Sequence, residues 1–164
     1  MTAHMLDTCP FVAPRMTVQP DWIDYNGHLN MAYYNVLFDR SIDELFDTIG
    51  IGRDYLETSG HSVFTVEAHV RYVREIGAAD AVRVSMWLVD YDPKRLIVFA
   101  QMHQADEGWL SATSETISIH VDMTARRTCP FPAAALENLR RFKAASDRSV
   151  KPEGIGRRIA MPAR

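Results

Sequence analysis

The feature that most constrains the fold is a long run of alternating apolar and polar residues between positions 62 and 122. Short polar turns at 90–94, which contains Pro93, and at 106–108 divide the run into segments of strand length. A period of two places every second side chain on the same face of a strand, and short turns join neighbouring strands antiparallel. The sequence therefore predicts an antiparallel meander with one buried face.

One long amphipathic helix is predicted at 31–49, immediately before this run. Its apolar residues recur every three or four positions, as a helix that buries one face requires: Tyr34, Phe38, Ile42, Leu45 and Ile49. Asn30 is a suitable N-cap, and Gly50 and Gly52 supply the stop signal. Because this is the only long apolar stripe available to cover the sheet, we expect an α+β fold. A short first strand within 11–20 completes a curled antiparallel sheet of five to six strands wrapped around one helix.

The chain length of 164 residues fits a single domain, which we assign to residues 1–145. A short helix is expected at about 133–145, and residues 146–164 are expected to form a flexible tail or an arm on a neighbouring subunit. The formal charge of −3 gives no reason to expect a nucleic-acid partner. No apolar stretch is long enough to span a membrane, and the N-terminus lacks a secretory pattern, so we expect a cytoplasmic protein.

A polar loop at 21–30 leads directly into the helix and carries a distinctive motif, Asp24-Tyr-Asn-Gly-His-Leu-Asn30. It resembles the signature of the 4-hydroxybenzoyl-CoA thioesterase group of hotdog proteins at Asp24, Gly27, His28, Leu29 and Asn30. The resemblance covers roughly residues 12–142, including the order of helix, strands and turns. It implies a hotdog fold, an acyl-CoA substrate, a catalytic Asp24 and a polarising backbone N–H near Met31. It also implies a homodimer or homotetramer and no cofactor, since coenzyme A is part of the substrate.

The chemistry of these residues agrees with that implication. Hydrolysis of an activated thioester needs a carboxylate that attacks the carbonyl or accepts a proton from water. A helix N-terminus supplies free N–H groups for the developing oxyanion. Asp24 has an ordinary alternative as a solvated or capping carboxylate, and Asp21 is a rival in the same loop. His28 can contact the substrate, orient Asp24 or be held by the loop alone.

The wider segment 18–34 is similar to the betainyl-CoA thioesterases of bacterial carnitine breakdown. A trimethylammonium group suits aromatic faces, with an accompanying carboxylate. The candidate substrate-binding residues are Asn30, Trp22, Tyr33, Tyr34 and Glu67. The other aromatic side chains available are Tyr25, Phe64, Tyr72, Trp87 and Trp109. The competing interpretation places the aromatic residues in the core, Glu67 in solvent and Asn30 only at the helix cap.

The phosphates of coenzyme A call for basic residues at the rim of a cleft. The candidates are Arg71, Arg74, Lys94, Arg95, Arg126 and Arg127. His69, His103 and His120 lie on separate predicted strands, so we expect no metal site.

Three other functions remain open from the sequence. A short- or medium-chain fatty acyl-CoA thioesterase would use the same loop. A non-catalytic acyl-CoA-binding hotdog protein would keep the fold without the chemistry. A hotdog hydratase would need an Asp–His or His–Glu pair elsewhere, and the sequence carries no such motif.

Overall fold

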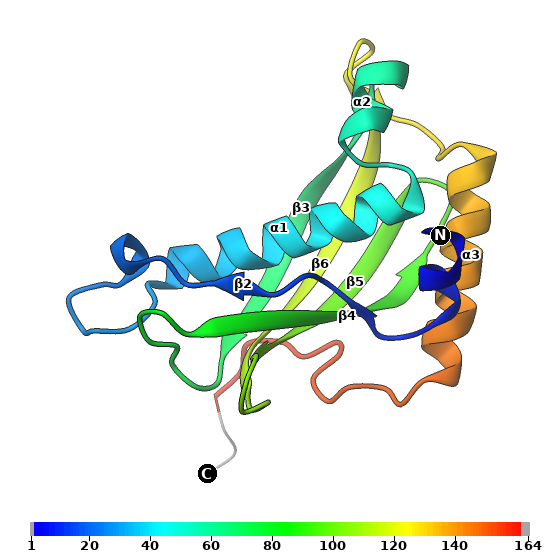
Figure 1. Ribbon diagram of the computed structural model, residues 1–164. Helices are drawn as coiled ribbons and strands as arrows, with labels where there is room; N and C mark the ends of the chain where they lie inside the picture. The colour runs from blue at the N-terminus through cyan, green and yellow to red at the C-terminus, as the bar shows by residue number, and fades with distance from the viewer. Residues whose placement is uncertain (1, 162–164) are drawn as a thin grey trace.

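A computed structural model of the chain describes residues 2–161 and contains an antiparallel sheet with one long helix across it (Figure 1). The helices are η1 (Thr2–Asp7), η2 (Pro20–Trp22), α1 (Met31–Ile49), α2 (Arg53–Ser59) and α3 (Ala133–Arg148). The strands are β1 (Phe11–Val12), β2 (Met16–Thr17), β3 (His61–Tyr72), β4 (Ala81–Tyr91), β5 (Arg95–Gln104), β6 (Leu110–Asp122) and β7 (Arg127–Thr128). No helix within residues 2–161 has the length and apolar character to cross a bilayer.

The sheet runs in the order β1-β4-β5-β6-β3, with β2 also paired to β4 and β7 paired to β6. It has seven strands rather than the predicted five to six. The expected first strand is divided in two around Pro14, which lacks the N–H that a continuous ladder requires. The second additional strand is the two-residue β7, which pairs with β6 at Val121 and Asp122.

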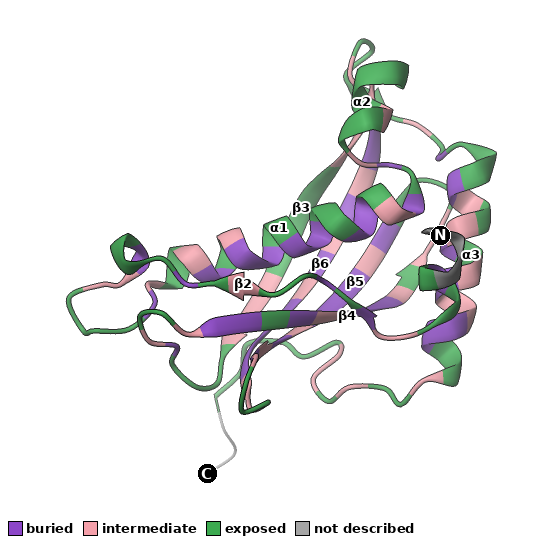
Figure 2. Cartoon of the chain, viewed as in Figure 1, coloured by how far each residue is buried: buried purple, intermediate pink, exposed green. Residues whose placement is uncertain are grey.

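The predicted helix is confirmed at its predicted bounds. Asn30 caps it through a 2.9 Å hydrogen bond from the Ala32 N–H to Asn30 Oδ1, and Gly50 ends it in the left-handed conformation at φ 88°. The buried face of α1 packs with the inner residues of β4 and β5 in one core (Figure 2). The core residues that α1, β4 and β5 contribute include Leu37, Phe38, Leu45, Val84, Met86, Val98 and Met102.

Two segments differ from the sequence expectation. Helix α2 was not predicted, because none of its residues is buried and it carries no apolar stripe. Helix α3 continues three residues beyond the expected end, to Arg148, and buries Phe142, Ala145 and Ser146. The segment after α3 returns across the outer face of the sheet, where the Gly156 N–H donates to Glu115 Oε2 at 2.7 Å.

Candidate active site at the start of the long helix

The loop that carries Asp24 is a tight hairpin rather than an open coil. Ile23 and Leu29 form a β-bridge, the Asp24 N–H donates to the His28 carbonyl at 2.9 Å, and the Gly27 N–H donates to the Asp24 carbonyl at 3.0 Å. Gly27 has φ 82°, a conformation that costs little only for glycine. The motif therefore folds back on itself, with Asp24 opposite His28 and Trp22 opposite Asn30, the N-cap residue of α1.

The Asp24 side chain is half-buried and is held within its own turn. Its Oδ1 atom accepts a 2.8 Å hydrogen bond from the Asn26 N–H. None of the hydrogen bonds between described residues uses Asp24 Oδ2. One carboxylate oxygen thus fixes the orientation, while the other is available to a substrate carbonyl or to water.

The first turn of α1 leaves one backbone donor available. The Asn30 N–H donates to the Trp22 carbonyl at 2.9 Å, the Ala32 N–H donates to the Asn30 side chain, and the Tyr33 N–H donates to the Asn30 carbonyl at 2.9 Å. Among the described residues, no acceptor faces the Met31 N–H, and Met31 is 64% exposed. A free N–H at a helix N-terminus can hydrogen-bond a developing oxyanion, which is the role expected for Met31.

Two of the aromatic candidates pack on each other beside this loop. The Trp22 and Tyr33 rings stack with centroids 5.3 Å apart and planes 10° apart, and the Arg40 guanidinium lies 5.4 Å from the Trp22 ring. Trp22 is only 8% exposed. This stack ties the residue that begins the hairpin to the side of α1.

Tyr34 and Tyr72 occupy the other side of the helix start. Tyr34 is 4% exposed, its hydroxyl accepts the Ile76 N–H at 3.2 Å, and burial raises its pKa. Tyr72 packs edge-on against Tyr34 with centroids 5.1 Å apart, and its hydroxyl donates to the Met31 carbonyl at 3.4 Å. From the sequence, Tyr72 was one aromatic candidate among several, because its partners Tyr34 and Met31 lie 38 and 41 positions away.

His28 and Glu67 lie apart from these contacts. The His28 side chain is exposed, and no hydrogen bond or ion pair between described residues involves it. Glu67 is exposed on β3, after a register shift at Val66, and faces Ile117 on the side of the sheet away from α1. Five residues of strand, about 17 Å, separate Glu67 from the Tyr72 end of β3. A single chain therefore does not bring Glu67 to Asp24.

A cavity of about 680 Å³ lies toward the other end of α1 and includes neither Asp24 nor Met31. Its charged lining comprises the carboxylates of Asp43, Glu44, Asp47 and Asp54 and the cations of Arg40 and Arg53. Burial, followed by the neighbouring charges of Asp39 and Asp47, raises the pKa of Asp43. The excess of negative charge disfavours the phosphates of coenzyme A in this cavity.

The basic residues proposed to bind the phosphates of coenzyme A differ in whether they already have partners. Arg95 is paired with Asp92 at 2.6 Å, and Arg74 lies 4.0 Å from the Trp109 ring. Lys94, Arg126 and Arg127 are exposed, and the ion pairs found between described residues do not include them. They line two adjoining grooves of about 400 and 210 Å³ that share Ile119 and Thr128.

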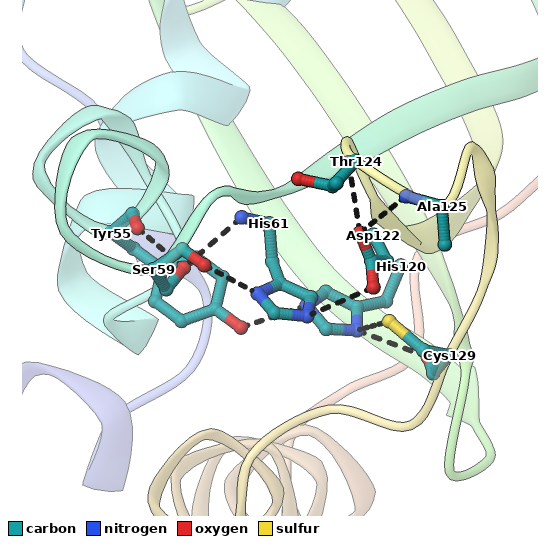
Figure 3. A network of polar contacts seen from close by, with 8 residues as sticks. All are labelled: Tyr55, Ser59, His61, His120, Asp122, Thr124, Ala125 and Cys129. Carbon is teal, nitrogen blue, oxygen red and sulfur yellow. Dashed lines mark hydrogen bonds and ion pairs between the residues drawn. The ribbon is translucent and has the colours of Figure 1, made fainter.

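A second polar cluster, at the α2 end of the molecule, was not predicted (Figure 3). His120 Nδ1 lies 3.0 Å from the Cys129 carbonyl oxygen and its Nε2 lies 2.9 Å from the Tyr55 hydroxyl. His61 stacks on His120 with centroids 5.4 Å apart. A carbonyl can only accept, so Nδ1 carries the proton and cannot deprotonate the Cys129 thiol, whose pKa burial raises. Within residues 2–161, no three side chains of His, Cys, Asp or Glu could hold a metal ion.

Comparison with known proteins gives a consistent result. The family model of the thioesterase-like superfamily matches residues 18–139. A betainyl-CoA thioesterase of Pseudomonas aeruginosa is 34% identical over 145 residues, which are 88% of this chain and 91% of that protein. An L-carnitine dehydrogenase/betainyl-CoA thioesterase of Ruegeria pomeroyi is 35% identical over 163 residues, and the chain spans about a third of its length. A Staphylococcus aureus protein solved in complex with CoA superposes with a TM-score of 0.86 at 27% identity, covering 94% of this chain and 97% of that one.

Proposed function

This chain belongs to the thioesterase-like superfamily and is a thioester hydrolase, and we propose that it hydrolyses betainyl-CoA to glycine betaine and coenzyme A. The two relatives described above carry that activity in their names, and the segments aligned with most of this chain are about a third identical to it. The reaction needs no cofactor beyond the coenzyme A of the substrate. A cytoplasmic location suits an acyl-CoA substrate and the two free cysteines, Cys9 and Cys129.

The proposal rests on two observations: the free Met31 N–H at the start of α1, and a carboxylate, Asp24, that the preceding hairpin holds in one orientation. The Met31 N–H hydrogen-bonds the thioester oxygen and stabilises the charge that develops on it. Asp24 then either attacks the carbonyl carbon, giving an anhydride that water hydrolyses, or removes a proton from the attacking water. In both routes the C–S bond breaks, the sulfur leaves as the coenzyme A thiol after protonation, and water supplies the new carboxylate oxygen.

The active form is proposed to be a homodimer joined along β3. Strand β3 ends the sheet, and none of the described strands pairs with its outer edge over its 12 residues. Phe64 and Val66 are exposed along it. A long apolar edge is normally covered by another strand, and a second β3 supplies one by twofold symmetry.

The test measures thiol release from betainyl-CoA and from a series of straight-chain acyl-CoAs of four to ten carbons. We expect betainyl-CoA to give the highest kcat/KM. Asp24→Asn is expected to lower kcat by at least about 100-fold, because it removes the reacting carboxylate and keeps the shape of the side chain. Asp21→Asn, in the same loop, is the matched control and should retain activity.

The outcomes separate the competing functions. Preference for the straight-chain substrates would identify a fatty acyl-CoA thioesterase and overturn the betainyl assignment. Binding of acyl-CoA without thiol release by the wild type would identify a non-catalytic binding protein. Loss of activity in Asp21→Asn, with activity retained in Asp24→Asn, would assign the chemistry to the rival carboxylate.

A further inference from the structure

The aromatic side chains near the helix start differ in whether they can still face a substrate. Trp22 and Tyr33 stack on each other, and Arg40 already occupies a face of Trp22 as its cation. Tyr34 is buried, with its hydroxyl engaged by the Ile76 N–H. Tyr72 is 46% exposed, with its hydroxyl bonded to the Met31 carbonyl and its ring in an edge-to-face pair with Tyr34. Among these four rings, Tyr72 is the one with substantial surface to offer.

Tyr72 is also tied directly to the proposed oxyanion donor. Its hydroxyl donates to the carbonyl of Met31, the residue whose N–H is free, and its ring is braced by the edge-on contact with Tyr34. These two contacts hold the ring against Met31, the residue whose backbone N–H is proposed to bind the thioester oxygen. A ring held in this way loses little freedom when it contacts a ligand.

The chemistry of the betainyl group requires its recognition element to be in this neighbourhood. The quaternary nitrogen is bonded to the carbon next to the thioester carbonyl, so only one methylene separates the two groups. A cation is attracted to an aromatic face within about 6 Å of the ring centroid. Once the Met31 N–H fixes the carbonyl oxygen, the trimethylammonium group must therefore lie near the residues that surround Met31.

We infer that Tyr72 determines acyl specificity, with its exposed ring face binding the trimethylammonium group of the substrate by a cation–π contact. This inference rests on the proposed function. The negative charge of the Glu75 carboxylate contributes to raising the pKa of the neighbouring Tyr34, after the larger effect of burial. A negative potential at this position adds to the preference for a cationic acyl group.

The test compares betainyl-CoA with 3,3-dimethylbutyryl-CoA, which has the same shape with carbon in place of the quaternary nitrogen and carries no charge there. The measured quantity is the ratio of the two kcat/KM values. Tyr72→Leu removes the aromatic face and should lower this ratio by about tenfold, the value of one partly desolvated cation–π contact. Tyr72→Phe keeps the face and should retain most of the ratio.

A control and a second measurement keep the result interpretable. Tyr91→Leu, at the C-terminal end of β4 and outside the residues around the helix start, should leave the ratio unchanged. Phenylalanines with increasing fluorination at position 72 preserve the shape of the ring while they weaken its negative face, so the ratio should fall stepwise with fluorine content. This series answers the question even if Tyr72→Leu does not fold.

Failure of this inference is distinguishable from failure of the proposed function. If the wild type prefers betainyl-CoA and the ratio survives both Tyr72→Leu and the fluorinated series, the role of Tyr72 is overturned and the proposed function stands. If the wild type hydrolyses the neutral analogue equally well, both the betainyl assignment and the role of Tyr72 are overturned.

Discussion

Removing the Tyr55 hydroxyl tests whether the cluster at the α2 end stabilises the fold rather than acting in catalysis. The hydroxyl lies 2.9 Å from Nε2 of His120, which is only 1% exposed. Tyr55→Phe leaves this buried nitrogen without its hydrogen-bond donor, which should lower the free energy of unfolding by about 1–3 kcal/mol. For a chain of 164 residues, each kcal/mol lowers Tm by about 2–4 °C, so the expected fall is about 2–12 °C.

The assay is differential scanning calorimetry beside a thiol-release measurement. Tyr25→Phe makes the same chemical change at a 98% exposed tyrosine and should leave Tm unchanged. The kcat of Tyr55→Phe below its Tm should equal that of the wild type, since the cluster lies at the opposite end of α1 from Asp24. An unchanged Tm would refute the reasoning about burial, and a large loss of kcat at full stability would show that the cluster takes part in the reaction.

Three further perturbations follow from the same structure. Val66→Lys places a charge on the exposed edge of β3 and should convert the proposed dimer to a monomer, measured by light scattering; an unchanged mass would exclude that edge as the interface. Trp22→Leu removes the stack that holds the Asp24 loop, so kcat should fall about tenfold with betainyl-CoA and with its neutral analogue alike. A fall in kcat with betainyl-CoA alone would instead indicate that Trp22 contacts the cation directly. Burial lowers the pKa values of His120 and His103, so the folded state binds fewer protons than the unfolded chain, and stability should decrease as pH falls below about 6.5. The measurement is Tm between pH 7 and pH 5 in His61→Gln, which removes the neighbouring stacked imidazole. A Tm that stays constant or rises as the pH falls would contradict this sign.

The long helix and the sheet around it could be predicted because their signals are local. The apolar spacing from Tyr34 to Ile49 and the cap at Asn30 together specify α1, and alternation specifies the long strands. The turn at Asp24 was equally accessible, since Gly27 permits the left-handed conformation that closes the hairpin. The strand number was underestimated because Pro14 divides the first strand and because the two-residue β7 exists only through its pairing with β6.

The contacts around the site depend on residues far apart in the chain, and no local pattern specifies them. Tyr72 reaches Met31 only because β3 ends beside the start of α1. The stack of Trp22, Tyr33 and Arg40 uses rings that the sequence assigned to the substrate. Their chemistry suited either role, and only the three-dimensional arrangement reveals that they already have partners. Helix α2 lacked a signal because none of its residues is fully buried and it carries no apolar stripe.

The most direct test is a crystal structure with a ketone analogue of betainyl-CoA in which a methylene replaces the sulfur. We expect the carbonyl oxygen within about 2.7–3.2 Å of the Met31 backbone nitrogen. We also expect an Asp24 carboxylate oxygen, or a water bonded to it, at about 3–3.5 Å from the carbonyl carbon. A carbonyl bound elsewhere, with Asp24 facing bulk solvent in every subunit, would contradict the proposed chemistry.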